Sequence, residues 1–345
     1  METKDRTVAV GVCASGIGRA AAQSRRGHFP HAAAVLSARA RSAQQHCQAF
    51  ARYWILDPVV GALTAAVFFL LRALPIDWCS AIGGVVGVLI GRSFERAATR
   101  RARQNFVRLS PAPVSDEEVD AAMTRLWSHV GRLFAETSIV DRLWEAGRIE
   151  VEGLHHLAAA RDAGRPHLMM GLHLGTWEAF GAVMYALGFP GKFFYLPARN
   201  RFQDRIARRA RRGWGKVLPM SIAGLREAYR TLVEERGAVV SWVDEFVRGR
   251  GVMAPLFGRP VLTRSNLANA VRLSLASGAA LLPFYVERLN GAHFRLTILP
   301  EVELTRSSDQ EADVIDNVRR IDRLITPIIT QRLDQWFLLL YLRLE

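Results

Sequence analysis

Short apolar segments alternate with longer amphipathic segments between residues 149 and 345. A short apolar run predicts a buried strand, and apolar residues at helical spacing predict a helix. Strands that alternate with helices form a sheet with helices on its faces. We therefore expect an α/β fold with a mixed central sheet flanked by helices. The expected strands are 167–172, 192–196, 238–243, 280–286 and 293–299, and the expected helices are 176–187, 200–213, 221–236, 265–277 and 309–333.

A long apolar region precedes this part of the chain. Residues 59–71 are all apolar or neutral, and residues 73–91 are largely apolar but contain Asp77. A membrane-spanning helix needs about 20 apolar residues. The region is therefore either a membrane anchor, spanning or interfacial, or a buried helical hairpin. The six arginines among residues 92–108 favour the anchor, because basic residues beside an apolar segment suit anionic headgroups on the cytoplasmic side.

These features predict three regions. Residues 1–50 are rich in Ala, Arg, Ser and Gln and have little periodicity, which predicts a poorly ordered leader. Residues 51–109 form the hydrophobic anchor and the basic juxtamembrane helix. Residues 110–345 form the catalytic domain, which begins with a helix capped by Ser115 and Glu118 in a capping box. The glycines at 11, 16 and 18 are not followed by a second strand, so we expect no dinucleotide cofactor.

The charge and the cysteines limit the class of function. A formal net charge of +14 favours polyanions, namely nucleic acid, anionic lipid or phosphorylated metabolites. The three cysteines are scattered and form no C-x-x-C pair. Their spacing argues against a disulfide framework and against a zinc site, so we expect no metal.

His173 is the strongest candidate for catalysis. It follows the expected strand 167–172, where open α/β sheets place their ligand sites. Gly175 permits a tight turn there, and Thr176 can cap the next helix. A neutral imidazole can take a proton from a hydroxyl, while Glu178, five residues later, can fix its tautomer. The motif alone fits a structural histidine at a strand end equally well.

Other polar residues follow the neighbouring strands. Arg199 and Asn200 open a very basic stretch, 199–216, which fits either a phosphate-bearing substrate or acidic carrier protein, or a solvated face. Asp244 ends the strand 238–243, where it can orient a ligand or cap the strand. Arg259 lies in a loop of Gly, Pro and aromatic residues, 254–260. We expect Arg199, Asn200, Asp244 and Arg259 to bind substrate.

In the order of its motifs, the chain from about residue 50 onward resembles the bacterial late acyltransferases of lipid A biosynthesis. That family includes lauroyl and myristoyl transferases, and the wider family includes phosphatidylinositol mannoside acyltransferases. The resemblance implies acyl transfer from an acyl carrier protein or coenzyme A to a hydroxyl of an anionic membrane glycolipid, without a cofactor. It also implies His173 and Glu178 as the catalytic pair and a place on the cytoplasmic face of the inner membrane. The matching positions are Asn105, Pro111, 173–178, 199–200, Asp244, 257–260, 279–286 and 334–336.

Some positions depart from the family pattern. Thr176 stands where the family commonly has Asn, Glu245 stands where Gln is usual, and an apolar tail follows Trp336. These departures keep a different lipid acceptor as an alternative. The net positive charge is also compatible with a second alternative, a nucleic-acid-binding protein. Nucleic acid binding would explain neither the apolar segment nor the order of the motifs. We therefore expect no nucleic acid partner.

Overall fold

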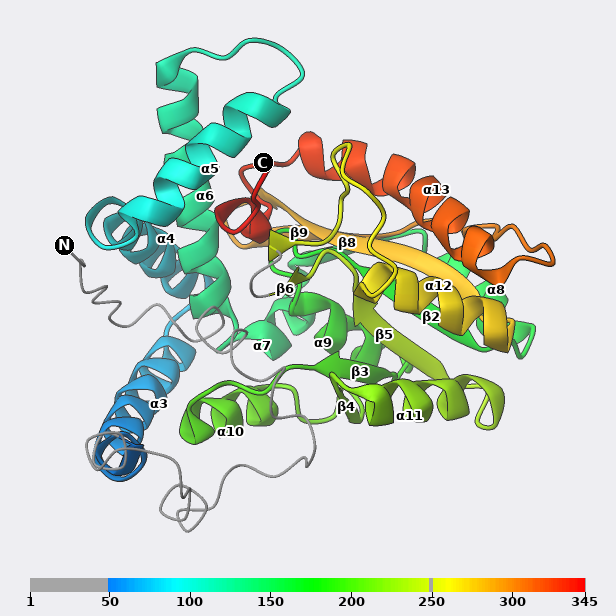
Figure 1. The fold of residues 1–345 in the computed structure, drawn as a ribbon. Coiled ribbons are helices and arrows are strands. Elements are labelled where there is room, and N and C mark those ends of the chain that lie inside the picture. Colours follow the sequence, from blue (N-terminus) through cyan, green and yellow to red (C-terminus); the bar gives the residue numbers. More distant parts are fainter. Residues whose placement is uncertain (1–48, 248–250, 345) are drawn as a thin grey trace.

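The fold is a mixed α/β layer structure in a computed structural model that describes residues 49–247 and 251–344 (Figure 1). Its main sheet has seven strands in the order β1-β9-β8-β2-β5-β3-β4. All neighbouring pairs are parallel except β8 and β9, which form an antiparallel hairpin. The strands are β1 (Ile149–Glu152), β2 (His167–Gly171), β3 (Lys192–Tyr195), β4 (Val217–Pro219), β5 (Ala238–Trp242), β8 (Ala280–Asn290) and β9 (His293–Ile298).

Helices cover both faces of this sheet (Figure 1). Successive residues of a strand point to opposite faces. Accordingly, Leu168 and Met170 share one core with Val271 of α12, while Met169 shares the other with Phe180 of α9. The helices of this part are α7 (Val140–Glu145), α8 (Leu154–Asp162), α9 (Ala179–Ala186), α10 (Arg201–Ala210), α11 (Ile222–Val233), α12 (Asn266–Ser277) and α13 (Gln310–Thr330).

The predicted elements are largely confirmed. All five expected strands and all five expected helices are present, with ends shifted by a few residues. The sequence missed β1 and β4, which are short edge strands without a continuous apolar run. It also missed the small antiparallel pair of β6 (Phe246–Val247) and β7 (Gly251–Val252). Nearly all of the expected leader, residues 1–48, lies outside the described residues.

Two helices at the start of the described chain are long and apolar enough to cross a membrane, Ala49–Ala73 and Ile76–Ser93. The first consists of a π-helical turn, η2 (Arg52–Leu56), and α3 (Asp57–Ala73), and it lies at the periphery beside α10 (Figure 1). The second is α4 (Ile76–Ser93). It packs so closely on α6 (Asp116–Glu136) that a side chain at Gly87 would overlap the carbonyl oxygen of Trp127. The apolar region is therefore not a simple buried hairpin: α3 exposes most of its surface, and α4 is held by the body.

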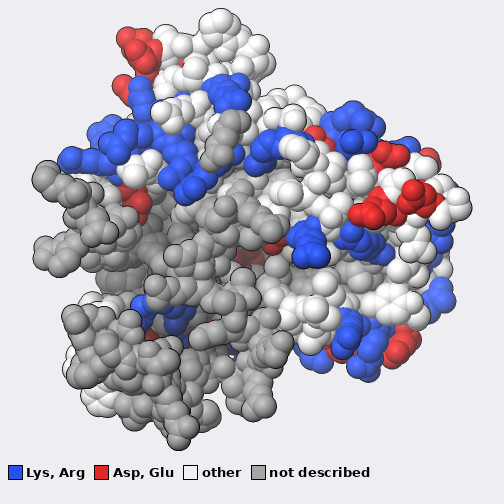
Figure 2. Space-filling view, in the orientation of Figure 1, with Lys and Arg blue, Asp and Glu red and all other residues white. Residues whose placement is uncertain are grey.

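The basic segment forms α5 (Arg96–Leu109), and Lys and Arg side chains gather over this part of the surface (Figure 2). The expected capping box opens α6, since Ser115 Oγ accepts from the Glu118 N–H at 3.2 Å and Glu118 Oε2 from the Ser115 N–H at 2.7 Å. Close to its carboxyl end the chain forms a buried 3₁₀ turn, η3 (Phe337–Leu340), which packs against α5.

Candidate active site

The sheet register brings His173 and Asp244 together. In the parallel pair of β2 and β5, Gly171 lies opposite Trp242. His173 and Asp244 each follow two residues after these partners, at the carboxyl edge of the sheet. When two segments leave neighbouring parallel strands in the same direction, the side chains that follow the two strands lie close together. The pair thus arises from strand order, across a sequence distance that no local motif spans.

Asp244 holds the histidine in one orientation. Its Oδ1 lies 2.8 Å from His173 Nδ1, and its Oδ2 accepts from the His173 backbone N–H at 2.8 Å. Trp336 Nε1 donates to the same Oδ2 at 2.8 Å, and the Asp244 carboxylate is fully buried. A carboxylate beside Nδ1 keeps the proton on that nitrogen, so Nε2 carries the lone pair. The His173 side chain is 22% exposed, so a substrate can reach the ring.

Glu178 does not orient His173, and that part of the sequence prediction is wrong. Its carboxylate instead accepts from Arg211 Nε at 2.8 Å and from Nη2 at 2.5 Å. Gly175, at φ +52°, turns the chain so that α9 begins only at Ala179, and Glu178 then faces α10. Asp244, which was expected to bind substrate, takes the orienting role. Any other part of Glu178 in catalysis stays a prediction.

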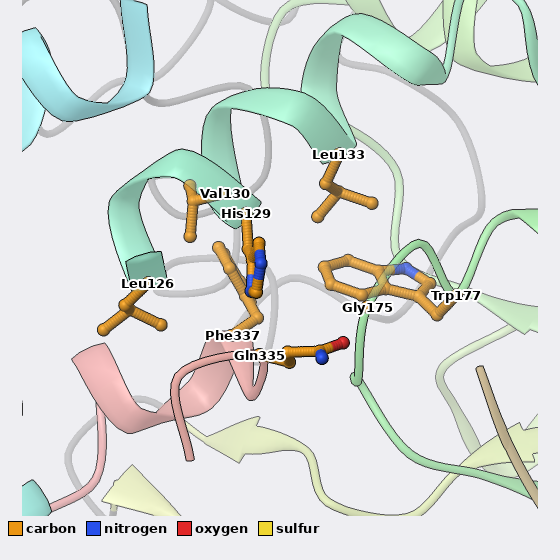
Figure 3. Close-up of a pocket in the computed structure, with 8 residues that line it drawn as sticks. All are labelled: Leu126, His129, Val130, Leu133, Gly175, Trp177, Gln335 and Phe337. Carbon is orange, nitrogen blue, oxygen red and sulfur yellow. The ribbon is translucent and has the colours of Figure 1, made fainter. Parts of the chain in front are cut away.

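A narrow apolar groove adjoins the turn that carries His173 (Figure 3). It lies between α6, the turn and the carboxyl-terminal segment, and its walls leave no space large enough for a water molecule. His129 lies in its wall and contacts the Asp334 carbonyl through Nδ1 at 2.9 Å. Burial, together with the Arg288 charge, lowers the pKa of His129 to about 4, so the ring is neutral near pH 7. The groove is lined by Leu126, His129, Val130, Leu133, Gly175, Trp177, Gln335 and Phe337.

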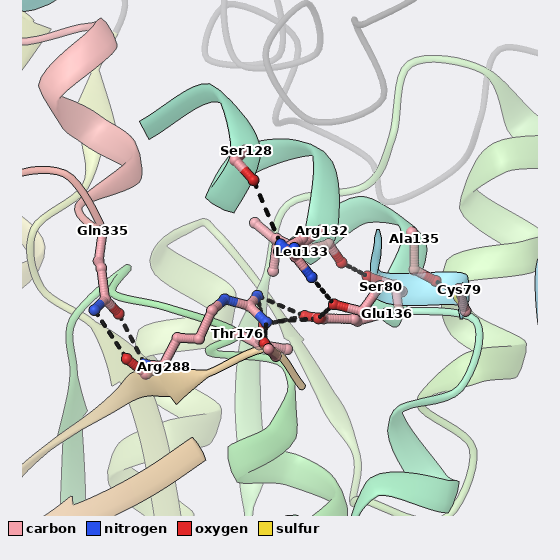
Figure 4. Close-up of polar contacts among 12 residues, drawn as sticks. Cys79, Ser80, Ser128, Arg132, Leu133, Ala135, Glu136, Thr176, Arg288 and Gln335 are labelled. Carbon is pink, nitrogen blue, oxygen red and sulfur yellow. Dashed lines mark hydrogen bonds and ion pairs between the residues drawn. The ribbon is translucent and has the colours of Figure 1, made fainter. Parts of the chain in front are cut away.

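A buried polar network supports the turn from below (Figure 4). Arg288 donates from Nη1 and Nη2 to the two oxygens of Glu136, at 2.6 and 2.7 Å. Thr176 donates to Glu136 Oε2 at 2.5 Å, and Ser80 of α4 donates to Oε1 at 2.6 Å. Burial alone would raise the pKa of Glu136, but the Arg288 charge and these hydrogen bonds outweigh it and lower the pKa. Thr176 therefore does not cap α9 as expected; it ties the turn to α6.

Asn200 has a structural role, and its expected contact with substrate stays a prediction. It is buried and caps α10, because its Oδ1 accepts from the N–H groups of Phe202 at 2.9 Å and Gln203 at 3.3 Å. Its Nδ2 donates to the Asp57 carbonyl at 2.9 Å, which ties α10 to the start of α3. Arg199, one residue earlier, is exposed, and its predicted contact with substrate stays a prediction.

Arg259 is likewise occupied within the protein. Its guanidinium donates to the carbonyls of Leu256 at 2.8 Å, Val252 at 2.7 Å and Pro255 at 2.6 Å. Burial lowers its pKa below the usual range. These bonds hold the loop 252–260 in shape, and the expected contact of Arg259 with substrate stays a prediction. In residues 49–247 and 251–344, no three His, Cys, Asp or Glu side chains are grouped so that they could hold a metal ion.

Residues 48–343 match the family model of bacterial lipid A biosynthesis acyltransferases. The chain belongs to this family. It is 26% identical over 266 residues to a lipid A biosynthesis palmitoleoyltransferase of Escherichia coli, covering 76% of this chain and 83% of the relative. It is 22% identical over 277 residues to a lipid A biosynthesis acyltransferase of Haemophilus influenzae, covering 79% and 85%.

Two further similarities were found. The chain is 27% identical over 268 residues to a phosphatidylinositol mannoside acyltransferase of Mycolicibacterium smegmatis, covering 74% of this chain and 84% of that one. The crystal structure of a 1-acyl-sn-glycerophosphate acyltransferase from Thermotoga maritima aligns with a TM-score of 0.35 at 14% identity, covering 79% and 97%. Membership of the lipid A acyltransferase family supports an O-acyltransferase that acts on a glycolipid.

In this member of the lipid A acyltransferase family, reasoning from sequence missed several residues of the site. Trp336 belongs to the family pattern, yet nothing in the sequence linked it to Asp244. Arg211 looked like one of many arginines in a basic run. Glu136 and Arg288 lie on elements far apart in the chain, and only their burial identifies them as partners.

Proposed function

We propose that the protein transfers a fatty acyl chain from a thioester, of acyl carrier protein or coenzyme A, to a hydroxyl of a membrane glycolipid such as a lipid A precursor. The observation that carries this proposal is the His173–Asp244 pair at the carboxyl edge of the sheet. It supplies a base with a fixed tautomer where α/β folds bind their ligands. Family membership supports the reaction class.

The mechanism follows from the free ring nitrogen. His173 Nε2 takes the proton of the acceptor hydroxyl while the oxygen attacks the thioester carbonyl. The tetrahedral intermediate collapses and breaks the carbon–sulfur bond, and the thiolate recovers the proton from His173. Asp244 stabilises the imidazolium that exists between these steps. The acyl group passes directly to the acceptor, with no covalent enzyme intermediate.

The surroundings of the site fit a lipid substrate. The side chains packed next to the turn that carries His173 are mostly apolar. The apolar helices α3 and α4 suit attachment to a membrane, and the basic residues of α5 suit its cytoplasmic face. We infer that the protein works at the inner membrane, where acceptor lipid and thioester donor meet.

The test replaces His173 by Ala and measures acyl transfer from an acyl carrier protein thioester to extracted glycolipid. We expect a loss of about 10²- to 10⁴-fold, the usual contribution of a general base. His155→Ala is the matched control, because His155 is exposed on α8, away from the sheet edge. Nearly normal transfer by the His173 variant would overturn the proposal. Mass spectrometry of lipids from a deletion strain and its complement would identify the acceptor and the chain length.

A further inference from the structure

A second groove, separate from the residues around His173, lies between α5 and the end of the chain. Its volume is about 390 Å³, and the surface around it is strongly basic (Figure 2). Three arginines converge on it, Arg101 and Arg108 from α5 and Arg343 from the terminal segment. None of the residues that line it is acidic. The lining is Arg101, Gln104, Asn105, Arg108, Leu342, Arg343 and Leu344.

Among the described residues, these arginines lack carboxylate partners such as those of Arg103 on the same helix. Arg103, on the same helix but outside the groove, pairs with Asp116 and Asp120. Within the described part of the chain, Arg101, Arg108 and Arg343 form no ion pair. Burial and then the nearby charge of Arg343 lower the pKa of Arg101, which shows that like charges approach each other here. A bound anion would relieve this repulsion.

The guanidinium groups keep donors for such an anion. Arg101 Nη1 donates to the Leu340 carbonyl at 2.9 Å, and Arg108 Nη1 donates to the Leu344 carbonyl at 2.7 Å. Each guanidinium carries five N–H donors, so each of these bonds uses one donor and leaves others for an anion. Planar arginine forks match the oxygens of a phosphate.

The neighbourhood indicates where the anion comes from. α5 follows α4 directly, and α4 exposes Val85 and Leu89 along an apolar helix that could enter a membrane. Phe94, between the two helices, and Val107, on α5, are also exposed. Basic residues at the end of an apolar helix lie at the level of lipid headgroups. We propose that the groove of Arg101, Arg108 and Arg343 binds the phosphate group of an anionic membrane lipid.

The same groove is joined to the catalytic centre through the chain end. Asn105 Nδ2 donates to the carbonyls of Leu339 at 3.0 Å and Leu342 at 2.9 Å, and so holds η3 on α5. Just before η3, Trp336 donates to Asp244. The bound lipid would therefore sit on the segment that also holds the orienting carboxylate.

The experiment measures binding to the full-length protein in detergent micelles. The probes are short-chain phosphatidic acid, short-chain phosphatidylcholine and inorganic phosphate. Arg343→Gln is the main variant because Arg343 makes no hydrogen bond that holds the fold in the described chain. Arg100→Gln is the matched control, since Arg100 is exposed on the same helix and does not line the groove.

We expect Arg343→Gln to weaken phosphatidic acid binding about tenfold, the size of one charge-assisted contact, and Arg100→Gln to change it less than about twofold. Phosphatidylcholine and inorganic phosphate should bind more weakly than phosphatidic acid. Equal losses in both variants would overturn the site, because general surface charge would then explain binding. Equally tight binding of inorganic phosphate would overturn the lipid assignment. The measurement involves no acyl transfer, so it is independent of the role of His173.

Discussion

Replacement of Asp244 by Asn tests which of two carboxylates, Asp244 or Glu178, orients His173. Asp244 accepts three hydrogen bonds, from His173 Nδ1–H, the His173 backbone N–H and Trp336 Nε1–H. An amide offers one oxygen and one NH₂ group in their place. If the oxygen faces the backbone and indole donors, the NH₂ group faces Nδ1. The ring then takes the tautomer with its proton on Nε2 and cannot accept a proton from a hydroxyl.

The expected size of the effect follows from this geometry. The wrong tautomer removes general-base catalysis, and in the serine protease triad the corresponding Asp to Asn change costs about 10⁴-fold in kcat. For Asp244→Asn we expect a loss of about 10³- to 10⁴-fold, which is roughly 4 to 5.5 kcal/mol in activation free energy. Glu178→Gln should cost less than about tenfold, because Glu178 contacts Arg211 and not the imidazole.

The assay is the initial rate of acyl transfer over a range of pH, with the thermal unfolding of each variant measured in parallel. A folded Asp244→Asn protein with a large loss in kcat would support the orientation seen here. The reasoning is refuted if Glu178→Gln loses about 10³-fold while Asp244→Asn stays near normal. That result would restore the local His173–Glu178 pair as the catalytic one.

Two further predictions concern buried residues next to the turn that carries His173. Arg288→Met leaves the buried Glu136 charge without its partner, so the free energy of unfolding should fall by about 3–5 kcal/mol. Adding Glu136→Gln should recover part of this loss in chemical denaturation; no recovery would contradict the pairing. His129 has its folded pKa near 4, below the ordinary value of 6.5, so the unfolded state binds its proton first as the pH falls. Stability should therefore drop between about pH 6.5 and 4, by at most about 3.4 kcal/mol. His129→Gln should flatten the dependence of the denaturation midpoint on pH over that window. An unchanged slope would show that His129 is not the responsible group.

The sequence predicted the strands and the position of His173 because those features depend on local pattern. A buried parallel strand reads as an apolar run, and its carboxyl end is a favoured place for a site. The partner of His173 was not local. Its identity depends on β5 lying beside β2, although β3 comes between them in the chain. Only the strand order makes Asp244 nearer than Glu178.

Two residues expected to bind substrate also have structural roles that the sequence did not predict. Asn200 and Arg259 are polar residues near strand ends. Helix starts and loops also lie there, and their backbone groups need hydrogen-bond partners. A buried helix start needs an acceptor for its free N–H groups, and a buried loop needs donors for its carbonyls. Asn200 supplies the acceptor and Arg259 the donors. Sequence alone cannot distinguish a side chain that binds substrate from one that satisfies the backbone beside it.

The chain end shows how a departure from the family pattern can follow from packing. Trp336 donates to Asp244, the Phe337 N–H donates to the His173 carbonyl at 3.1 Å, and the Gly175 N–H donates to the Gln335 carbonyl at 3.2 Å. Residues 335–337 thus support the turn on both sides of His173. These three residues are held in place by η3, whose four residues are buried in the core against α5 and α6. The apolar tail after Trp336 therefore helps to fix the tryptophan, and through it the orientation of His173.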